Sequence, residues 1–198
     1  MKAKKQAVKK LVYGVGVNDA DYKVNTINES GKRVRCPIYT QWKNMMARCY
    51  AESTHKNQPT YRECSIDPRW YSFMNFKKWM LTQRYEGLHL DKDILFEGNK
   101  VYGPDTCVFV STEVNMFLSP NTSKEVNGID LPRGVFGSVD NYYTFKSVEG
   151  KRTWYRGFKT VEEAYVMYLT LKKERAIEIA SKQVDPRVSN ALLKRFLE

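Results

Sequence analysis

TWYRGFKTVEEAYVMYLTLKKERAIEIA, from Thr153 to Ala180, changes from a strand-like pattern to a helical one. The first six residues alternate as a half-buried strand does. Thr160 and Glu163 then have the spacing of a capping box, and apolar residues recur behind them at helical steps. The stretch therefore predicts a strand followed directly by a long helix.

The segments around this stretch predict the rest of a small domain. RGVFGSV (133–139) and YYTFKSV (142–148) have the composition of strands, and EGKR forms a turn before the third strand. We expect a three-stranded antiparallel sheet packed on one helix, with a short final helix in DPRVSNALLKRFLE. Residues 131–198 are predicted to form this domain, and the polar residues 119–130 a linker before it.

The preceding part of the chain, residues 36–118, predicts an α+β unit. Its first helix, PIYTQWKNMMARCY, starts at Pro37 and places apolar residues on one face. Residues 1–35 are basic and poor in large apolar side chains, which predicts an extended or partly mobile arm. Further elements are expected as a strand at Cys64–Ile66, a helix from about Pro68 with Asp67 as its cap, strands at His89–Phe96 and Cys107–Ser111, and a helix starting at Ser111 or Thr112.

The charge of the chain points to a polyanionic partner. Its 198 residues contain 33 Lys and Arg and 22 Asp and Glu, a net charge of +11. Nucleic acid is the expected partner of so basic a chain. An anionic membrane surface, an acidic protein or a simple gain in solubility are the alternatives.

The sequence also bears on location and on its cysteines. No stretch approaches the roughly 18 apolar residues of a spanning helix, and the lysines of MKAKKQAVKKLVYG precede no apolar run. We therefore expect a cytoplasmic protein of bacterial or phage origin, with reduced thiols. The cysteines lack a Cys-x-x-Cys pair, so they are either core residues or a structural Zn²⁺ site formed by Cys36, Cys49, Cys64 and Cys107.

The C-terminal segment resembles the APETALA2/ethylene-response-factor type of DNA-binding domain. The resemblance rests on the opening Arg133–Val135, on WYRGF at Trp154–Phe158, which is one residue tighter than the family pattern, and on TVEEAYVMY. In that family the sheet lies in the major groove of double-stranded DNA, as the shape of a β-ribbon permits. Carried over by position, the DNA contacts are Arg133, Lys146, Arg152, Trp154 and Arg156; alternation places the last three on one face, with Tyr155 opposite.

The middle segment resembles phage-encoded HNH-like (His-Me finger) proteins of the homing-endonuclease type. The resemblance covers residues 36–118 and rests on YTQWKNMMARCY, LDKDI and VYGPDTCVFVSTEVN. It implies a ββα unit that cleaves DNA with one divalent metal and a histidine base. At the usual histidine position this chain has Asp91 or Lys92 instead.

The resemblance and the hard oxygen donors together predict a Mg²⁺ or Mn²⁺ site. Asp91 and Asp93 fall on one face of a regular strand and, with Asn115, are the expected ligands. His89 lies on that face too and is either the base or an ordinary surface histidine. Asn99 lies in the loop and can assist, whereas His55 is expected to be a solvated loop residue.

These features predict a metal-dependent DNA endonuclease. One alternative is a catalytically degenerate scaffold that only binds DNA, such as a regulator or host-takeover factor. Another is a protein whose basic surface binds an acidic host protein. If Asp91→Ala/Asp93→Ala abolishes nicking and retains DNA binding, the endonuclease is favoured, whereas no nicking by the wild type with any metal favours the first alternative. Weak DNA affinity even at low salt favours the second.

Overall fold

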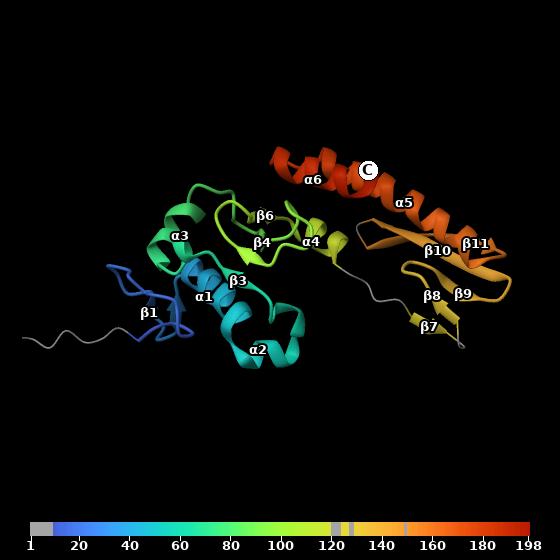
Figure 1. Ribbon diagram of the computed structural model, residues 1–198. Helices are drawn as coiled ribbons and strands as arrows, with labels where there is room; N and C mark the ends of the chain where they lie inside the picture. The colour runs from blue at the N-terminus through green and yellow to red at the C-terminus, as the bar shows by residue number, and fades with distance from the viewer. Residues whose placement is uncertain (1–9, 120–123, 127–128, 149) are drawn as a thin grey trace, which may run out of the picture. The chain divides into compact units, whose positions relative to one another are not determined.

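The chain divides into two compact units between Thr112 and Glu113. The computed structural model describes residues 10–119, 124–126, 129–148 and 150–198, and both units mix helices with strands (Figure 1). The predicted α+β class is confirmed. The division precedes the predicted linker at 119–130, so most of the helix that follows the second predicted strand belongs to the second unit.

The described part of the first unit consists of helices and three small two-stranded sheets. β1 pairs with β2 and β4 with β6, both antiparallel, whereas β3 and β5 are parallel. The bounds are β1 (Asn25–Ile27), β2 (Arg33–Arg35), α1 (Pro37–Tyr50), α2 (Glu52–Asn57), η1 (Pro59–Tyr61), β3 (Ser65–Ile66), η2 (Pro68–Trp70), α3 (Phe73–Met80), β4 (His89–Asp91), β5 (Val101–Tyr102) and β6 (Val108–Val110).

An aromatic core holds this unit together. The predicted apolar face of α1 is confirmed, since Ile38, Trp42, Met45, Met46 and Cys49 are all buried. The indole N–H of Trp42 donates to the carbonyl oxygen of Trp70 at 2.7 Å, so this buried polar group is satisfied.

The segment before α1 packs more closely than the sequence predicts. The carboxylate of Asp19 accepts from the Ser72 hydroxyl (2.6 Å) and the Met74 amide (2.9 Å), at the start of α3. The backbone of Val17 pairs with that of Tyr71 and Phe73. Residues 10–35 are therefore not a free arm, and residues 1–9 lie outside the described part of the chain.

Side-chain caps make two other elements differ from expectation. Asp67 is a cap as predicted, but of the short helix η2, and α3 begins after a second cap at Ser72. The strand expected at His89–Phe96 ends at Asp91, because the Asp91 carboxylate turns the backbone that follows.

The second unit contains the predicted sheet and helix. β9, β10 and β11 form an antiparallel sheet in the order β11-β10-β9, and α5 packs on one of its faces (Figure 1). A further hairpin, β7–β8, lies in the segment expected to be a linker. The bounds are α4 (Thr112–Leu118), β7 (Lys124–Val126), β8 (Ile129–Leu131), β9 (Phe136–Ser138), β10 (Asn141–Val148), β11 (Lys151–Phe158), α5 (Val161–Ser181) and α6 (Pro186–Leu197).

The predicted capping box of α5 is confirmed. The Thr160 hydroxyl accepts from the Glu163 amide at 3.2 Å, and the Glu163 carboxylate accepts from the Thr160 amide at 3.4 Å. Behind the box, Ala164 and Leu171 are buried towards the sheet core. The helix that follows the third strand is thereby fixed against the inner face of the sheet, which leaves the outer face for other contacts.

Candidate functional site

The outer face of the β9–β10–β11 sheet carries a row of arginine and aromatic side chains. Arg152, Trp154 and Arg156 alternate along β11 as predicted, and Tyr155 faces the other way. Across the register, Trp154 pairs with Phe145 and Arg156 with Tyr143. We call this surface the arginine–aromatic face; it consists of Phe136, Tyr143, Phe145, Arg152, Trp154 and Arg156.

The rings of this face hold the two arginines in place. The guanidinium carbon of Arg152 lies 4.7 Å from the Phe145 ring centroid. The guanidinium carbon of Arg156 lies 5.0 Å from the Trp154 ring centroid. Both are cation–π distances. Both arginines are exposed, and in the described part of the chain neither forms an ion pair with a carboxylate. They are therefore pre-oriented cations with donors available to a ligand.

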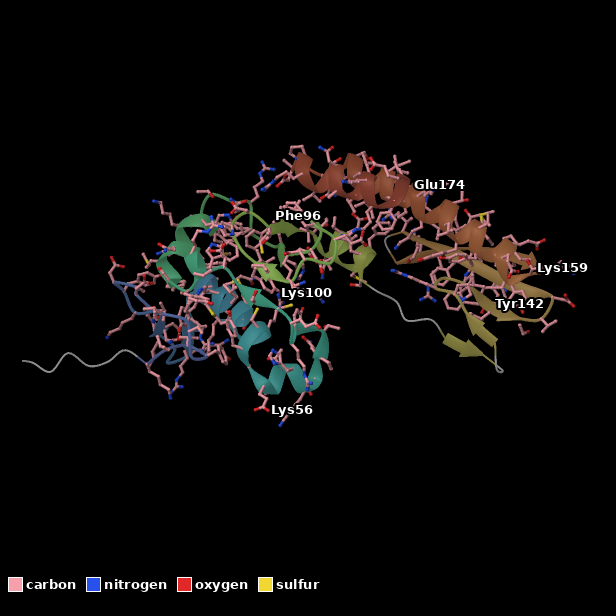
Figure 2. The ribbon with its side chains drawn as sticks, viewed as in Figure 1. Lys56, Phe96, Lys100, Tyr142, Lys159 and Glu174 are labelled. Atoms are coloured by element: carbon pink, nitrogen blue, oxygen red, sulfur yellow. The ribbon has the colours of Figure 1, made fainter. Side chains whose placement is uncertain are left out.

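Two residues predicted to join this face lie elsewhere. Lys146 faces α5, where its ammonium bonds Glu178 at 2.5 Å and lies 3.6 Å from Glu174, which projects from α5 (Figure 2). Arg133 is half-buried in the loop before β9, and its Nη2 donates to the carbonyl oxygen of Ser119 at 2.7 Å. The alternation of YYTFKSV places Lys146 with Thr144 on the inner side.

Strand alternation also predicts that aromatic residues of β10 lie on this face, although they were not among the predicted DNA contacts. Tyr143 and Phe145 are odd-numbered positions of β10 and therefore share the face of Trp154. Phe136 joins them from β9, with its ring centroid 5.4 Å from that of Phe145. The face is broader and more aromatic than the resemblance alone implies.

In the first unit, Asp91 shapes the turn that follows β4. Its Oδ1 accepts from the amides of Asp93 (2.9 Å) and Ile94 (2.8 Å). Burial, and then the charge of Asp93, raise the pKa of the Asp91 carboxyl. We call residues 91–94 the acidic turn.

A buried lysine and an asparagine complete the acidic turn. Lys92 is 9% exposed, and its ammonium donates to Asp93 Oδ2 (3.2 Å) and to the Asn99 carbonyl (2.9 Å). The Asn99 amide donates in turn to the carbonyl oxygens of Lys92 and Val101. Asn99 therefore holds the loop backbone in shape.

The other predicted site residues are placed as follows. His89 is exposed on the same face of β4 as Asp91, and its Nε2 lies 3.0 Å from the Thr112 hydroxyl. Asn115 is exposed on α4, most of which belongs to the second unit. His55 is half-buried on α2, and its Nε2 lies 3.0 Å from the Arg48 carbonyl oxygen, so the expectation of a solvated loop residue is wrong.

The donors of the acidic turn fit magnesium, whereas the thiols do not fit zinc. Mg²⁺ commonly binds through one or two carboxylates together with water and phosphate. Asp91 Oδ2 and the Asp93 carboxylate are donors of this type, although Asp93 Oδ2 also accepts from the Lys92 ammonium. Burial raises the pKa of Cys49 and Cys107 to about 12, which favours thiols over the thiolates that zinc needs. Cys64 is buried too, and Cys36 is half-buried near the Tyr22 hydroxyl. Among the described residues no three Cys, His, Asp or Glu side chains gather as a metal site.

No family model, no curated protein and no solved structure matches this chain. In the part of the chain that the structure describes, none of the helices has the length and apolar character to cross a membrane.

Proposed function

We propose that the protein binds double-stranded DNA through the arginine–aromatic face. The observation that carries the proposal is the pair Arg152 and Arg156, exposed two residues to either side of Trp154 and stacked on rings of the same face. Guanidinium groups form bidentate contacts with guanine edges and with phosphates. A stacked guanidinium loses less side-chain freedom on binding than an unrestrained one does.

The shape and charge of the chain agree with this partner. A β-ribbon fits the major groove of B-DNA, and the chain carries a net charge of +11. Contacts to phosphates release counterions, so affinity should fall steeply with salt. An acidic protein partner is the competing explanation of the same charge, and it does not require a face built of alternating arginines and rings.

The test is fluorescence anisotropy of a short random-sequence duplex over a range of salt concentrations. We expect Arg152→Gln/Arg156→Gln to weaken binding about tenfold or more. The slope of log affinity against log salt should also become shallower, by about 0.9 for each phosphate that the variant no longer neutralises. The matched control is Lys173→Gln/Lys194→Gln, which removes the same charge from exposed positions on α5 and α6.

Comparison of the two double variants separates the contribution of the sheet face to DNA affinity from that of the overall charge. Equal losses in the two double variants would mean that only the net charge matters, and the face would then have no special role. Weak binding of the wild type even at low salt would favour an acidic protein partner.

A second candidate function is metal-dependent cleavage of the DNA backbone by the first unit. The observation that favours it is the acidic turn, where Asp91 and Asp93 are close enough for one charge to raise the pKa of the other carboxyl, with His89 on the same face of β4. Asp91 and Asp93 would hold a Mg²⁺ ion, which stabilises charge on the phosphate undergoing attack. His89 is exposed and would take a proton from water.

Nicking of supercoiled plasmid with Mg²⁺ or Mn²⁺, against EDTA, tests this second function. Asp91→Asn keeps an oxygen that accepts from the Asp93 and Ile94 amides, so it removes the charge without removing the turn. We expect nicking to be lost in Asp91→Asn, Asp93→Asn and His89→Gln and kept in the control Asp105→Asn, at an exposed position. Intact plasmid with a retained salt-sensitive DNA complex would leave a protein that acts by binding alone.

A further inference from the structure

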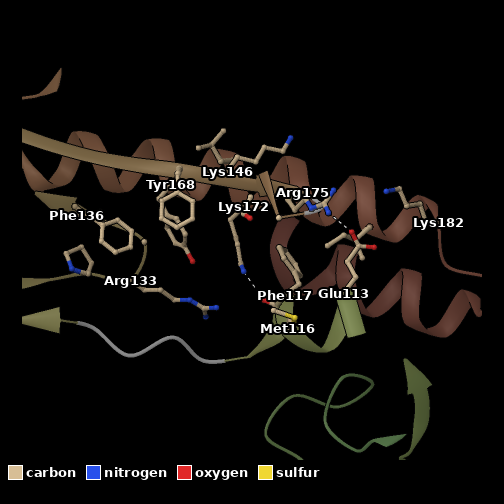
Figure 3. Close-up of a pocket in the computed structure, with 18 residues that line it drawn as sticks. Glu113, Met116, Phe117, Arg133, Phe136, Lys146, Tyr168, Lys172, Arg175 and Lys182 are labelled. Atoms are coloured by element: carbon tan, nitrogen blue, oxygen red, sulfur yellow. Dashed lines mark hydrogen bonds and ion pairs between the residues drawn. The ribbon is translucent and has the colours of Figure 1, made fainter. Parts of the chain in front are cut away.

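A cavity of about 890 Å³ lies within the second unit (Figure 3). Phe136 and Phe145 of the arginine–aromatic face also line it, but Arg152, Trp154 and Arg156 do not. Its walls come from α4, the loop before β9, β10 and α5. The volume is within the range of small-molecule sites. The residues that matter for its chemistry are Phe117, Arg133, Phe136, Tyr168, Lys172 and Arg175.

The ammonium group of Lys172 lies in this cavity, and no carboxylate in the described part of the chain neutralises its charge. Its ammonium donates to the Phe117 carbonyl at 2.8 Å and lies 3.7 Å from the Phe117 ring centroid. An ammonium has three donors, and in the described part of the chain Lys172 has no carboxylate partner. Burial, and then the charge of Arg133, lower the pKa of Lys172 to about 8.

Arg133 is the second such cation. Its Nη2 donates to Ser119, whereas its Nε is buried with no hydrogen-bond partner. Buried donors are nearly always paired, so a lone one calls for an explanation such as a ligand. The side chains of Arg133 and Lys172 extend into the same part of the cavity, from the loop before β9 and from α5 (Figure 3).

The acidic groups that the structure describes near the cavity are already engaged. Arg175 bonds both Glu113 and Glu178, and Lys146 bonds Glu178 and lies close to Glu174. These pairs leave Arg133 and Lys172 as two neighbouring positive charges in a half-buried site. An anion between them would relieve their repulsion and supply the missing acceptors.

Aromatic groups form the remainder of the wall. Phe117 and Tyr168 line the cavity from α4 and α5, and Phe136 lies at its edge (Figure 3). The Tyr168 ring packs against Gly134, where an added Cβ would lie 2.1 Å from the ring. Gly134 therefore covers part of the Tyr168 ring and holds it in place, and a flat ring of a ligand can pack against the apolar surface that these side chains present to the cavity.

We propose that this cavity binds a nucleotide, with its phosphate at Arg133 and Lys172 and its base against the aromatic wall. The nucleotide can be free in solution or the 5′-phosphorylated end of a DNA strand, and both present a phosphate monoester beside an aromatic base. Free nucleotide binding is independent of the proposed DNA contact at the arginine–aromatic face. The strand-end form extends that proposed function.

Calorimetry with the full chain tests the proposal, using 2′-deoxyadenosine 5′-monophosphate, inorganic phosphate and 2′-deoxyadenosine as probes. We expect the monophosphate to bind, phosphate to compete with it, and deoxyadenosine to bind at least about tenfold more weakly. Affinity should fall as pH rises through about 8, where Lys172 loses its proton.

Variants localise the site. Lys172→Gln and Arg133→Gln should each weaken the monophosphate about tenfold, whereas Lys173→Gln, exposed on the same helix, should bind like the wild type. Arg152→Gln/Arg156→Gln should also bind the monophosphate normally, so failure of the DNA-binding face does not affect this test. Competition by inorganic phosphate in the wild type needs no variant to fold.

A single-stranded oligonucleotide with and without a 5′-phosphate distinguishes the two sources. Binding of the monophosphate supports a free nucleotide, and binding of only the 5′-phosphorylated strand supports a strand end. The proposal is overturned if neither probe binds at millimolar concentration, or if Lys172→Gln and Arg133→Gln both bind like the wild type.

Discussion

Phe145 and Trp154 face each other across β10 and β11, with ring centroids 5.0 Å apart. Arg152 stacks on Phe145, and Arg156 stacks on Trp154. The pair therefore separates two exposed cations and fixes the position of each. The two guanidinium groups on this face are exposed, whereas most of its rings are half-buried, so the face combines available charge with ring packing.

Trp154→Ala should weaken DNA binding while leaving the fold nearly intact. Trp154 is 40% exposed, so removal of its ring from the cross-strand pair with Phe145 should lower the free energy of unfolding by about 1 kcal/mol or less. Affinity for duplex DNA should fall about tenfold, because both arginines lose a ring partner. Chemical denaturation and anisotropy measure the two effects. Trp154→Phe is the control and should retain most affinity; a large loss of stability in Trp154→Ala would instead place this ring in the core.

In contrast to Trp154→Ala, Lys146→Gln should lower the stability of the protein and leave DNA binding unchanged. Lys146 is on the inner side of the sheet and bonds Glu178, so we expect a loss of about 1 kcal/mol in unfolding free energy and unchanged DNA affinity. Lys146, and then Arg175, hold the pKa of Glu178 below its usual value. The stabilisation is therefore present at neutral pH and is lost as pH falls through that lowered pKa. Denaturation at neutral and acidic pH measures this loss, and a tenfold fall in DNA affinity would contradict the assignment.

Sequence reasoning succeeds where the determining contacts are local. The capping box joins residues three positions apart, and strand alternation needs only neighbouring side chains, so α5 and the face of β11 are predictable. The partner of Lys146 lies 32 positions away on α5, and no local pattern reveals it. The register of β10 alone would have placed Lys146 on the inner side.

The first unit shows two other limits of local patterns. Asp19 reaches Ser72 across 53 positions, and this contact fixes a segment whose composition predicts an arm. LHLDKDIL has the alternation of a longer strand, but the Asp91 side chain competes for the backbone amides that the strand would need. The acidic pair is recognisable in the sequence, whereas its role in the turn is not.

Gly134→Ala should destabilise the protein by about 2–4 kcal/mol. Gly134 has φ +82°, and an added Cβ would lie 2.1 Å from the Tyr168 ring, so backbone strain and a steric clash act together. Gly150→Ala is the matched control, since Gly150 has φ +79° but no atom within 4 Å of an added Cβ. It should lose only about 1 kcal/mol. Equal losses in denaturation experiments would show that the contact with Tyr168 is unimportant.

Lys172→Met should stabilise the protein at neutral pH. The lysine is half-buried between the Phe117 and Phe196 rings, and burial disfavours its charged form. A methionine keeps the apolar packing without the charge, which should add about 1 kcal/mol after allowance for the exposed part of the side chain.

The pH dependence of this gain has a definite sign. The pKa of Lys172 is lowered from 10.5 to about 8 in the folded chain, so between these values the unfolded chain binds more protons than the folded one. The wild type therefore gains stability relative to Lys172→Met as pH rises from about 8 towards 10.5. Denaturant titrations across this range should show the gap closing, whereas Lys173→Met, at an exposed position, should show no such trend. A stability difference that stays constant with pH would mean that Lys172 is as well solvated as Lys173. The cavity would then contain no uncompensated charge at Lys172.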